Sequence, residues 1–247
     1  MRQTVIISDL HLSVHRPELI QAFESFTKRL ADDTDLIIAG DFFDFFVGIN
    51  KNDAMITRLQ GIIQSLVKRK VNIKFQCGNR DYLVDKNACR FLSMTLLPDE
   101  YLLDTPQGKA LLIHGDLLCL HDQGLKRFRK LCHNRLALGL FRLLPFFIRN
   151  YIGSAIRSKS AQAEAYRNIT PEDELVIKKE AEILALKQQC RILIHGHFHI
   201  FGCHRDPASG IIMRLSLGGW GKKYSYVYIS DKTIELIERP IDELLNN

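Results

Sequence analysis

The segment 35–44, DLIIAGDFFD, constrains the fold of this chain most strongly, because it joins an apolar run to a glycine and an aspartate. Leu36–Ala39 has the length and the β-branched content of a buried strand. Gly40 lets the backbone turn sharply, and Asp41 follows it directly. Open α/β folds carry their binding groups just beyond the ends of parallel strands. The segment alone predicts either a turn aspartate or a site carboxylate at the edge of a sheet.

Four further apolar runs of strand length also end in polar residues, and this repetition favours a site over a turn. The runs are Thr4–Ser8, Val71–Gln76, Lys109–Ile113 and Arg191–Ile194. Together the strand ends provide the candidate metal ligands Asp9, His11, Asp41, Asn79, His114, His197 and His199. Residues two apart in an extended chain point to the same side, so we expect Asp9 and His11 to reach one ion together.

Segments with helical spacing of apolar residues lie between several of these strands. They are 18–30, 54–70 and part of 166–187, in which Thr170 and Pro171 have the character of a helix start. Strands that alternate with helices predict parallel βαβ units and an α/β fold. Late strands at 211–217, 224–230 and 233–238 are expected to complete a mixed or second sheet.

Composition limits the class of protein and of partner. The chain has 247 residues, 46% of them hydrophobic, and we expect one domain over residues 1–247. Its formal charge of +6 and pI near 9.0 favour an acidic partner: a phosphate substrate, a nucleic acid or an anionic membrane surface. Six scattered cysteines without a CxxC pair predict reduced thiols in a cytosolic protein. We expect neither a signal peptide nor a membrane-spanning segment, because no apolar run reaches about 18 residues.

The candidate ligands form a nitrogen and oxygen donor set without a thiolate. Such a set suits Mn, Fe or Zn ions better than a thiolate-rich zinc site would. Seven protein ligands are too many for one ion but suit two ions that share a carboxylate, and Asp41 is the natural bridge. Two ions roughly 3.5–4 Å apart would clamp a phosphoryl group and activate a water molecule between them.

The blocks D-x-H (9–11), G-D (40–41), G-N-x-D (78–81), H-G (114–115) and G-H-x-H (196–199) resemble those of the calcineurin-type metallophosphoesterase superfamily, in the same order. The resemblance implies two packed mixed β-sheets flanked by helices, with the ligands on loops at one edge. It implies that one metal ion is held by Asp9, His11, Asp41 and His199. It implies that the other is held by Asp41, Asn79, His114 and His197.

Arg80 departs from the superfamily pattern, in which histidine often follows the asparagine. Arginine stays protonated at ordinary pH, so it cannot act as a general acid. It can bind phosphate oxygens through two N–H groups and stabilise charge in the transition state. The leaving group should therefore need little protonation, as expected for a phosphate anhydride, and Asp81 is expected to orient Arg80. We expect the catalytic residues to be Asp41, Arg80 and His114.

The block HGDLLCLHDQG (114–124) and the run LPFFIR (144–149) are similar to a narrower family, the UDP-2,3-diacylglucosamine pyrophosphatases of lipid A biosynthesis. In that family an inserted helical lid contacts the glucosamine phosphate and encloses the acyl chains; it corresponds here to residues 121–169, called the helical insert below. The resemblance implies hydrolysis of the substrate pyrophosphate to UMP and 2,3-diacylglucosamine 1-phosphate, with the new oxygen on UMP. It implies the substrate contacts Asn79, Arg80, Asp122, Arg157, Ser160 and Arg167.

The same resemblance implies the cofactors, partners and location of the protein. Two Mn²⁺ ions are the expected cofactors, with other divalent cations as alternatives. The expected partners are the UDP-linked diacylated glucosamine lipid and the anionic inner-membrane surface, which a cytoplasmic protein would meet peripherally on its cytoplasmic face. The chain departs from the family pattern in three ways: Asp44 stands where glutamate is common, Arg167 stands roughly where the family has a lysine, and the run AEAYR (163–167) replaces the usual Asn-Ser-Ser-Lys.

The helical insert combines basic and apolar residues in an unusual way. No Asp or Glu occurs between Gln123 and Ala163, a stretch that is rich in arginine, leucine and phenylalanine. This composition is typical of an interfacial or anion-binding segment, and the alternative is a buried helix pair with a solvated basic face. Pro145 is expected to break the helical pattern and give a helix–turn–helix.

Two rival functions remain open on the sequence. The first is another phosphoesterase on the same core: a nucleotide pyrophosphatase, a cyclic-nucleotide phosphodiesterase or a nuclease. The leucine- and phenylalanine-rich insert argues against a nuclease, so we expect no nucleic acid partner. The second is a non-catalytic scaffold, which typically loses metal ligands, whereas every ligand position is filled here.

Overall fold

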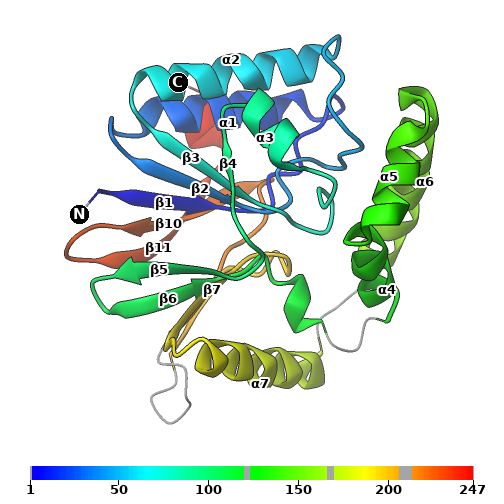
Figure 1. Cartoon of the computed structure of the whole chain (residues 1–247). Helices are drawn as coiled ribbons and strands as arrows, with labels where there is room; N and C mark the ends of the chain where they lie inside the picture. Colours follow the sequence, from blue (N-terminus) through cyan, green and yellow to red (C-terminus); the bar gives the residue numbers. More distant parts are fainter. Residues whose placement is uncertain (1, 120–122, 166–169, 206–212, 247) are drawn as a thin grey trace.

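The structure, a computed structural model, describes residues 2–119, 123–165, 170–205 and 213–246. Two β-sheets form the centre of the protein, with helices on their outer faces and a group of helices standing to one side (Figure 1). This is the α/β architecture with two packed sheets that the sequence predicts.

The first sheet has the strand order β11-β10-β1-β2-β3-β4. Its strands are β1 (Thr4–Ile7), β2 (Asp35–Ala39), β3 (Asn72–Gln76), β4 (Thr95–Leu96), β10 (Lys223–Ile229) and β11 (Ile234–Pro240). Strands β1 to β4 are parallel, and β10 and β11 join them antiparallel. The register pairs Ile7 with Ile38 and Ile38 with Phe75, so the carboxyl ends of β1, β2 and β3 lie level at one edge.

The second sheet has the order β5-β6-β7-β9-β8. Its strands are β5 (Tyr101–Thr105), β6 (Gly108–Leu112), β7 (Ile192–His195), β8 (Gly202–Arg205) and β9 (Met213–Ser216). Strands β6, β7 and β9 are parallel, whereas β5 and β8 pair antiparallel at the two borders. The ends of β6 and β7 therefore carry the His114 and His197 loops to one edge as well.

Apolar side chains alternate between two core layers along the central strands. Ile6 and Ile37 pack with Leu112 and Ile194 between the sheets. Their neighbours along β1 and β2, such as Ile38, face the other way, under helices α1 (Pro17–Arg29) and α2 (Ala54–Lys68). Burial on both faces explains why β1 and β2 are apolar at every position after the first.

Helices cover the outer faces of both sheets. Helices α1 and α2 lie on the first sheet together with the shorter α3 (Lys86–Phe91) and α8 (Asp242–Leu245), and α7 (Pro171–Lys187) lies on the second (Figure 1). The predicted cap of α7 is present, since the hydroxyl of Thr170 accepts from the N–H of Asp173 and the Asp173 carboxylate accepts from the N–H of Thr170.

The sequence predicted most elements with ends within two residues of those observed. It missed β4, β5, β8, α3 and α8. The hairpin between β5 and β6 turns at Gly108, whose φ of 111° suits a glycine. The first two residues of the predicted strand 211–217 lie outside the described residues.

The described part of the helical insert consists of α4 (Gln123–Cys132), α5 (Arg135–Leu143) and α6 (Phe146–Ala165), which stand beside the two sheets (Figure 1). Pro145 lies at the break between α5 and α6, which are bent by 120°, as the sequence predicted. Within the described ranges no single helix has the length and apolar composition to cross a membrane. The bent pair Leu136–Leu143 and Phe146–Ser158 meets both criteria only when its helices are taken together.

Candidate metal centre

Strained backbone marks the strand ends that the sequence singled out. Asp9, His11, Asp41, His197 and His199 all have positive φ angles, between 49° and 70°. L-residues rarely adopt this region, and each such residue costs on the order of 1–3 kcal/mol. Five strained residues at adjoining strand ends indicate that the fold holds their side chains in place for a function.

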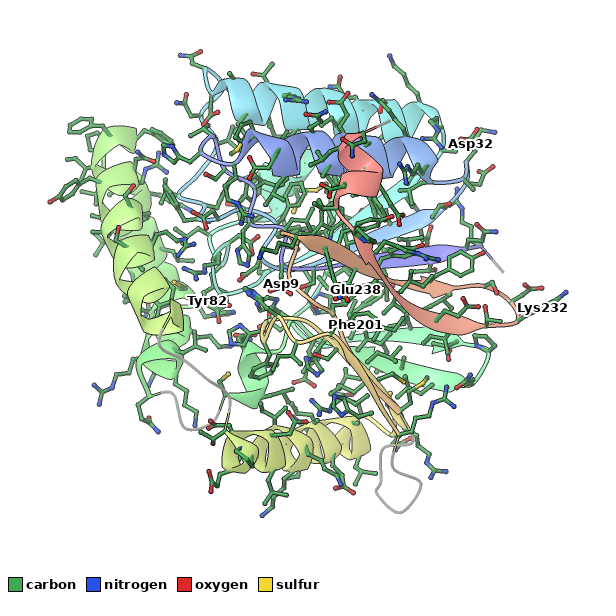
Figure 2. The ribbon with its side chains drawn as sticks, turned by 180° about the vertical axis from the view of Figure 1, so that it is seen from behind. Asp9, Asp32, Tyr82, Phe201, Lys232 and Glu238 are labelled. Atoms are coloured by element: carbon green, nitrogen blue, oxygen red, sulfur yellow. The ribbon has the colours of Figure 1, made fainter. Side chains whose placement is uncertain are left out.

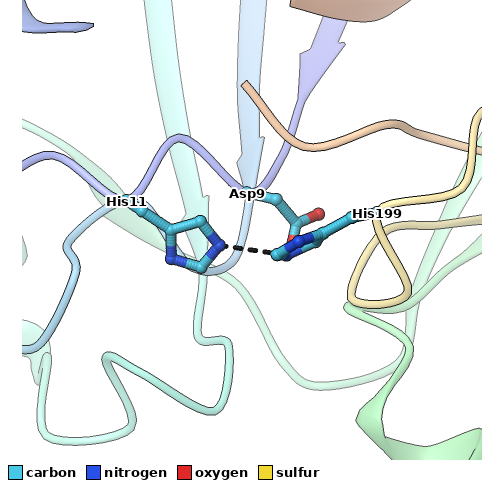
Figure 3. A group of neighbouring side chains, drawn as sticks. All are labelled: Asp9, His11 and His199. Carbon is cyan, nitrogen blue, oxygen red and sulfur yellow. Dashed lines mark hydrogen bonds and ion pairs between the residues drawn. The ribbon is translucent and has the colours of Figure 1, made fainter. Parts of the chain in front are cut away.

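One group of ligand atoms is formed by Asp9, His11 and His199 (Figure 3). Nε2 of His11 lies 3.0 Å from Nε2 of His199, which in turn lies 3.3 Å from Oδ1 of Asp9. The backbone N–H of His11 donates to the carbonyl of Asp41 at 3.0 Å, which fixes the end of β1 against the end of β2. Three side chains from two strand ends, those of β1 and β7, thus converge on one point.

A second group surrounds His114. Nδ1–H of His114 donates to the carbonyl of Ala39 at 3.0 Å, so Nε2 is directed into the cluster. Nε2 lies 3.5 Å from Oδ1 of Asp41 and 3.0 Å from Oδ1 of Asn79. Nδ1 of His197 lies 2.8 Å from the same oxygen of Asn79. Metal-binding histidines commonly have this carbonyl support on the nitrogen that faces away from the ion.

Asp41 lies between the two groups. Its Oδ2 is 4.0 Å from Nε2 of His11, while its Oδ1 faces His114. The side chain is buried, with 2% of its residue surface exposed. The two carboxylate oxygens therefore face the two groups of candidate ligands, as a bridging ligand requires.

Gly78 and Asp81 hold Asp41 in this position. A Cβ on Gly78 would lie 2.3 Å from Oδ1 of Asp41, so only glycine fits there. The carboxylate of Asp81 accepts from the backbone N–H groups of Gly78 at 2.7 Å, Phe42 at 2.8 Å and Asp41 at 3.3 Å. The expectation that Asp81 orients Arg80 is therefore corrected: Asp81 instead joins the loops after β2 and β3, because their N–H groups converge on it.

The electrostatics of the cluster favour cations. Burial raises the pKa of Asp41 to about 8 and outweighs the attraction of His114. Burial opposes the protonation of His114, but the carboxylates of Asp41 and Asp9 outweigh it and raise the pKa of His114 to about 9. Burial would also raise the pKa of Asp9, yet the hydrogen bond and charge of His199 hold it below its usual range. Without a cation, buried groups of this cluster thus retain protons that a divalent ion would displace.

The donor chemistry and geometry fit metal ions. Carboxylate, amide and imidazole donors suit borderline and hard divalent cations. Burial lowers the pKa of His197 to about 3, so this ring is neutral and has a lone pair to offer at neutral pH. Asp9, Asp41 and His114 also offer ligand atoms that lie within 4.8 Å of one another.

Two arginines lie close to this cluster. Arg80 is buried, and its backbone N–H donates to Oδ1 of Asp41 at 2.8 Å. Burial lowers the pKa of His11 against the attraction of Asp9, and the charges of Arg80 and Arg157 lower it further. Nε of Arg157, on α6, donates to Oδ1 of Asp44 at 2.6 Å. The sequence did not predict this contact, although both residues were singled out for separate reasons.

The other predicted substrate residues cannot be placed in the same way. Asp122 and Arg167 lie outside the described residues. Ser160 lies on α6, but its side chain is outside the described part of the structure. The structure thus brings together the candidate metal ligands, Arg80 and Arg157.

Four arginines attach the helical insert to segments that join the strands and helices of the core. Arg157 pairs with Asp44, Arg142 with Asp85 at 2.8 Å, and Arg149 donates to the carbonyl of Val47 at 2.7 Å. Arg129 pairs with two carboxylates, Asp99 and Asp116. The alternative of a buried helix pair with a solvated basic face is therefore wrong for Arg129, Arg149 and Arg157, which turn inwards, whereas Arg142 stays exposed. Large apolar side chains turn outwards instead: Leu136, Leu140, Leu143, Phe147 and Tyr151.

Cys119 is a site neighbour that the sequence did not indicate, whereas Asp116 was expected to be a supporting or turn carboxylate rather than a ligand. Sγ of Cys119 lies 3.3 Å from Nε2 of His197, whose other ring nitrogen faces Asn79. Asp116 is buried and lies two residues after His114. The block 114–124 that carried the resemblance contains both residues, so their position next to a ligand was the available signal.

Comparison with known proteins agrees with this geometry. A profile of the calcineurin-like phosphoesterases matches residues 3–201. The chain belongs to the calcineurin-like phosphoesterase family. As a member of it, this phosphoesterase is a metal-dependent hydrolase.

Similar proteins include "UDP-2,3-diacylglucosamine hydrolase" of Psychromonas ingrahamii, 34% identical over 243 residues, which are 97% of this chain and 98% of that protein. The protein of the same name from Proteus mirabilis is 35% identical over 240 residues, 96% of this chain and 99% of that one. Among solved structures, TT1561 of Thermus thermophilus is 10% identical with a TM-score of 0.46, and the match covers 97% of this phosphoesterase and 99% of that chain.

Proposed function

We propose that this phosphoesterase hydrolyses the pyrophosphate bond of UDP-2,3-diacylglucosamine and releases UMP and 2,3-diacylglucosamine 1-phosphate. The near full-length similarity to proteins named for that substrate supports the proposal. One structural observation supports it independently: the helical insert lines an apolar cavity and also directs Arg157 to the edge of the ligand cluster.

We propose two Mn²⁺ ions as the cofactors, with other divalent cations as alternatives. One would be held by Asp9, His11, Asp41 and His199, and the other by Asp41, Asn79, His114 and His197. Two such ions, when bound, polarise phosphoryl oxygens and lower the pKa of a water molecule. Asp41 would keep the two ligand groups in fixed relation, because the N–H groups that Asp81 binds leave its loop little freedom.

Arg80 and Arg157 would bind the phosphate groups of the substrate. Within the described residues, Nη1 of Arg157 is buried without a hydrogen-bond partner, while its Nε is held by Asp44. A guanidinium group held on one side and open on the other is prepared to accept an anion. Neither arginine can donate a proton to the leaving group, which suits a phosphate that leaves as an anion.

A cavity between the helical insert, the loop after β2 and helix α3 would receive an acyl chain. It has a volume of about 330 Å³. Its lining includes Phe46, Val47, Leu83, Phe91 and Phe141. Arg142 and Arg149 of the insert also line the cavity, next to these apolar side chains. Such a site gives room to an aliphatic chain and places positive charge next to it, as an acylated sugar phosphate requires.

We propose that the helical insert acts as the lid over this substrate and also contacts the anionic inner-membrane surface from the cytoplasmic side. Leu136, Leu143, Phe147 and Tyr151 are 73–82% exposed. Exposed apolar residues on helices that also carry lysines and arginines favour binding in the plane of a membrane interface. The lipid substrate would then enter the cavity without leaving that interface.

The direct test is hydrolysis of the lipid nucleotide in detergent micelles, with and without Mn²⁺. Soluble UDP-sugars, cyclic nucleotides and single-stranded DNA serve as the competing substrates. The proposal predicts Mn²⁺-dependent release of UMP from the lipid nucleotide at a rate far above every soluble substrate. Equal rates on UDP-sugars would refute the lipid substrate, and turnover after complete removal of metal would refute the metal-dependent mechanism.

A further inference from the structure

A buried carboxylate next to the metal cluster joins three chain segments at one atom. Oδ2 of Asp116 accepts hydrogen bonds from the hydroxyl of Tyr82 and from Nη1 of Arg129. Asp116 follows His114 by two residues, and Tyr82 follows Arg80 by two residues. Arg129 lies on α4, the first helix of the helical insert. The loop of a metal ligand, the loop of a catalytic arginine and the insert therefore meet at this oxygen.

Packing around the junction is tight. Asp116 is 6% exposed and Tyr82 is 8% exposed. The guanidinium carbon of Arg129 lies 5.6 Å from the centre of the Tyr82 ring. The centre of the Phe128 ring lies 5.9 Å from the centre of the same Tyr82 ring. Figure 2 shows Tyr82 between Asp9 and the helices of the insert. Contact between α4 and the site loops thus runs through these side chains.

Arg129 binds two carboxylates at once. Its Nη1 donates to Asp116 and its Nη2 donates to Asp99, which precedes β5. The planar fork of arginine can join two carboxylates in this way, whereas the single ammonium of lysine cannot reproduce that geometry. Removing the arginine would take from Asp116 the cation that compensates its charge, and an uncompensated buried charge forces its surroundings to rearrange.

We infer that Asp116, Tyr82 and Arg129 are positioning residues that couple the location of helix α4 to the loops carrying Asn79, Arg80 and His114; the inference rests on the proposed function for the role of those loops. When α4 is seated, the three hydrogen-bonded groups hold the second ligand group in its binding geometry. When α4 moves away, Asp116 loses its cation and the His114 loop loses its support. Substrate enclosure by the insert and completion of the second metal position are therefore one event.

The inference predicts an effect on one metal ion and not on the other. The first ligand group is fixed by contacts among its own side chains and by the bond from the end of β1 to the end of β2, so the first ion should bind normally. The second ion should bind about tenfold more weakly in Tyr82→Phe and Arg129→Gln, the lower end of the loss that follows removal of a supporting partner. Arg129→Lys should recover less than the full affinity.

The test is a Mn²⁺ titration of the full chain without substrate. Calorimetry measures the affinity for each ion, and the EPR signal of paired ions shows when both positions are filled. Arg142→Gln is the matched control: it breaks another arginine–carboxylate contact of the insert, to Asp85, which lies outside the metal loops. Hydrogen exchange at the amides of Leu118 and Cys119, which bond within the loop after His114, provides a second measurement. Exchange there should rise in Tyr82→Phe and Arg129→Gln and stay unchanged in Arg142→Gln.

Three results separate the inference from the proposed function. Wild-type affinity for both ions in Tyr82→Phe and Arg129→Gln would overturn the coupling, and so would equal weakening in Arg142→Gln. If Arg129→Gln fails to fold, the single-hydroxyl change in Tyr82→Phe decides the matter. If the wild-type protein binds neither Mn²⁺ nor another divalent cation, the proposed function fails, and the hydrogen-exchange arm alone confirms or overturns the coupling.

Discussion

Replacing Asp81 by asparagine should destabilise the protein and disperse the metal ligands, although Asp81 itself is not a candidate ligand. Oδ1 of Asp81 accepts from the N–H groups of Gly78 and Asp41, at 2.7 and 3.3 Å. Oδ2 accepts from the N–H groups of Phe42 and Phe43, at 2.8 and 3.4 Å. Asn has one carbonyl oxygen, so its amide NH₂ must face one of these two pairs of donors.

The loss can be estimated from the bonds. A hydrogen bond to a charged group contributes roughly 1.5–3 kcal/mol, and a buried N–H left without a partner costs roughly 1–3 kcal/mol more. Removing a carboxylate whose pKa burial raises to about 6 offsets part of this loss. The lost hydrogen bonds and the unpaired N–H groups lower the free energy of unfolding, and removal of the buried carboxylate partly restores it. Together we expect the free energy of unfolding of Asp81→Asn to fall by about 3 kcal/mol.

Urea denaturation of the metal-free protein at pH 7.5 measures this change, and a Mn²⁺ titration of the same variant should show weakened binding. Asp85→Asn is the matched control. Asp85 caps α3 through Oδ1 alone, which accepts from the N–H groups of Asn87 and Ala88 at 2.9 Å, and asparagine keeps that oxygen. The control should lose less than about 1 kcal/mol, because asparagine is as good a cap and the exposed pair with Arg142 contributes little. Equal stability of Asp81→Asn and the control would refute the role assigned to Asp81.

Three further predictions concern binding, chemistry and pH. Arg157→Ala should raise KM about tenfold or more with a smaller effect on kcat, because it removes a phosphate contact that supports binding; a normal KM in steady-state kinetics would count against that contact. Hydrolysis in H₂¹⁸O should place the label in UMP, as mass spectrometry of both products can show; label in the sugar phosphate would place the attack on the other phosphorus. Burial lowers the pKa of His195 to about 3, against its hydrogen bond to the carbonyl of Gly196 and with the charge of Arg214 nearby. Above pH 6.5 the His195 ring is neutral in both the folded and the unfolded protein. As the pH falls from 6.5 towards 3, the ring binds a proton in the unfolded chain but not in the folded protein. The free energy of unfolding of the metal-free protein should therefore fall by up to about 1.4 kcal/mol for each pH unit below 6.5 because of this residue. In urea denaturation, His195→Gln should make the free energy of unfolding less pH-dependent between pH 6.5 and 4.5.

The convergence of ligands could be predicted because it follows from local rules. Each strand that bears a ligand is an apolar run that stops at a polar residue, and parallel strands deliver such ends to one edge of a sheet. Asp9 and His11 do reach one group as expected, but the predicted reason was wrong: both residues lie beyond the end of β1 with positive φ angles, so an extended chain does not align them. Pro145 marked the break in the insert, because proline cannot continue a helix.

The supports of the site could not be predicted, because they depend on contacts between distant segments. Asp81 was assigned to its neighbour Arg80, but the N–H groups of a loop about forty residues earlier reach it in the folded protein. Nothing in the sequence around Arg129 indicates that it binds Asp116. The border strands β5 and β8 were missed because they are short and partly exposed, so they lack the continuous apolar pattern of the central strands.

Crystals soaked in Mn²⁺ and measured at the manganese absorption edge give the most direct test of the central claim. Two anomalous peaks should appear roughly 3.5–4 Å apart, with one oxygen of Asp41 next to each or one oxygen shared by both. A single peak, or two peaks that Asp41 does not contact, would contradict a dinuclear centre built at these strand ends.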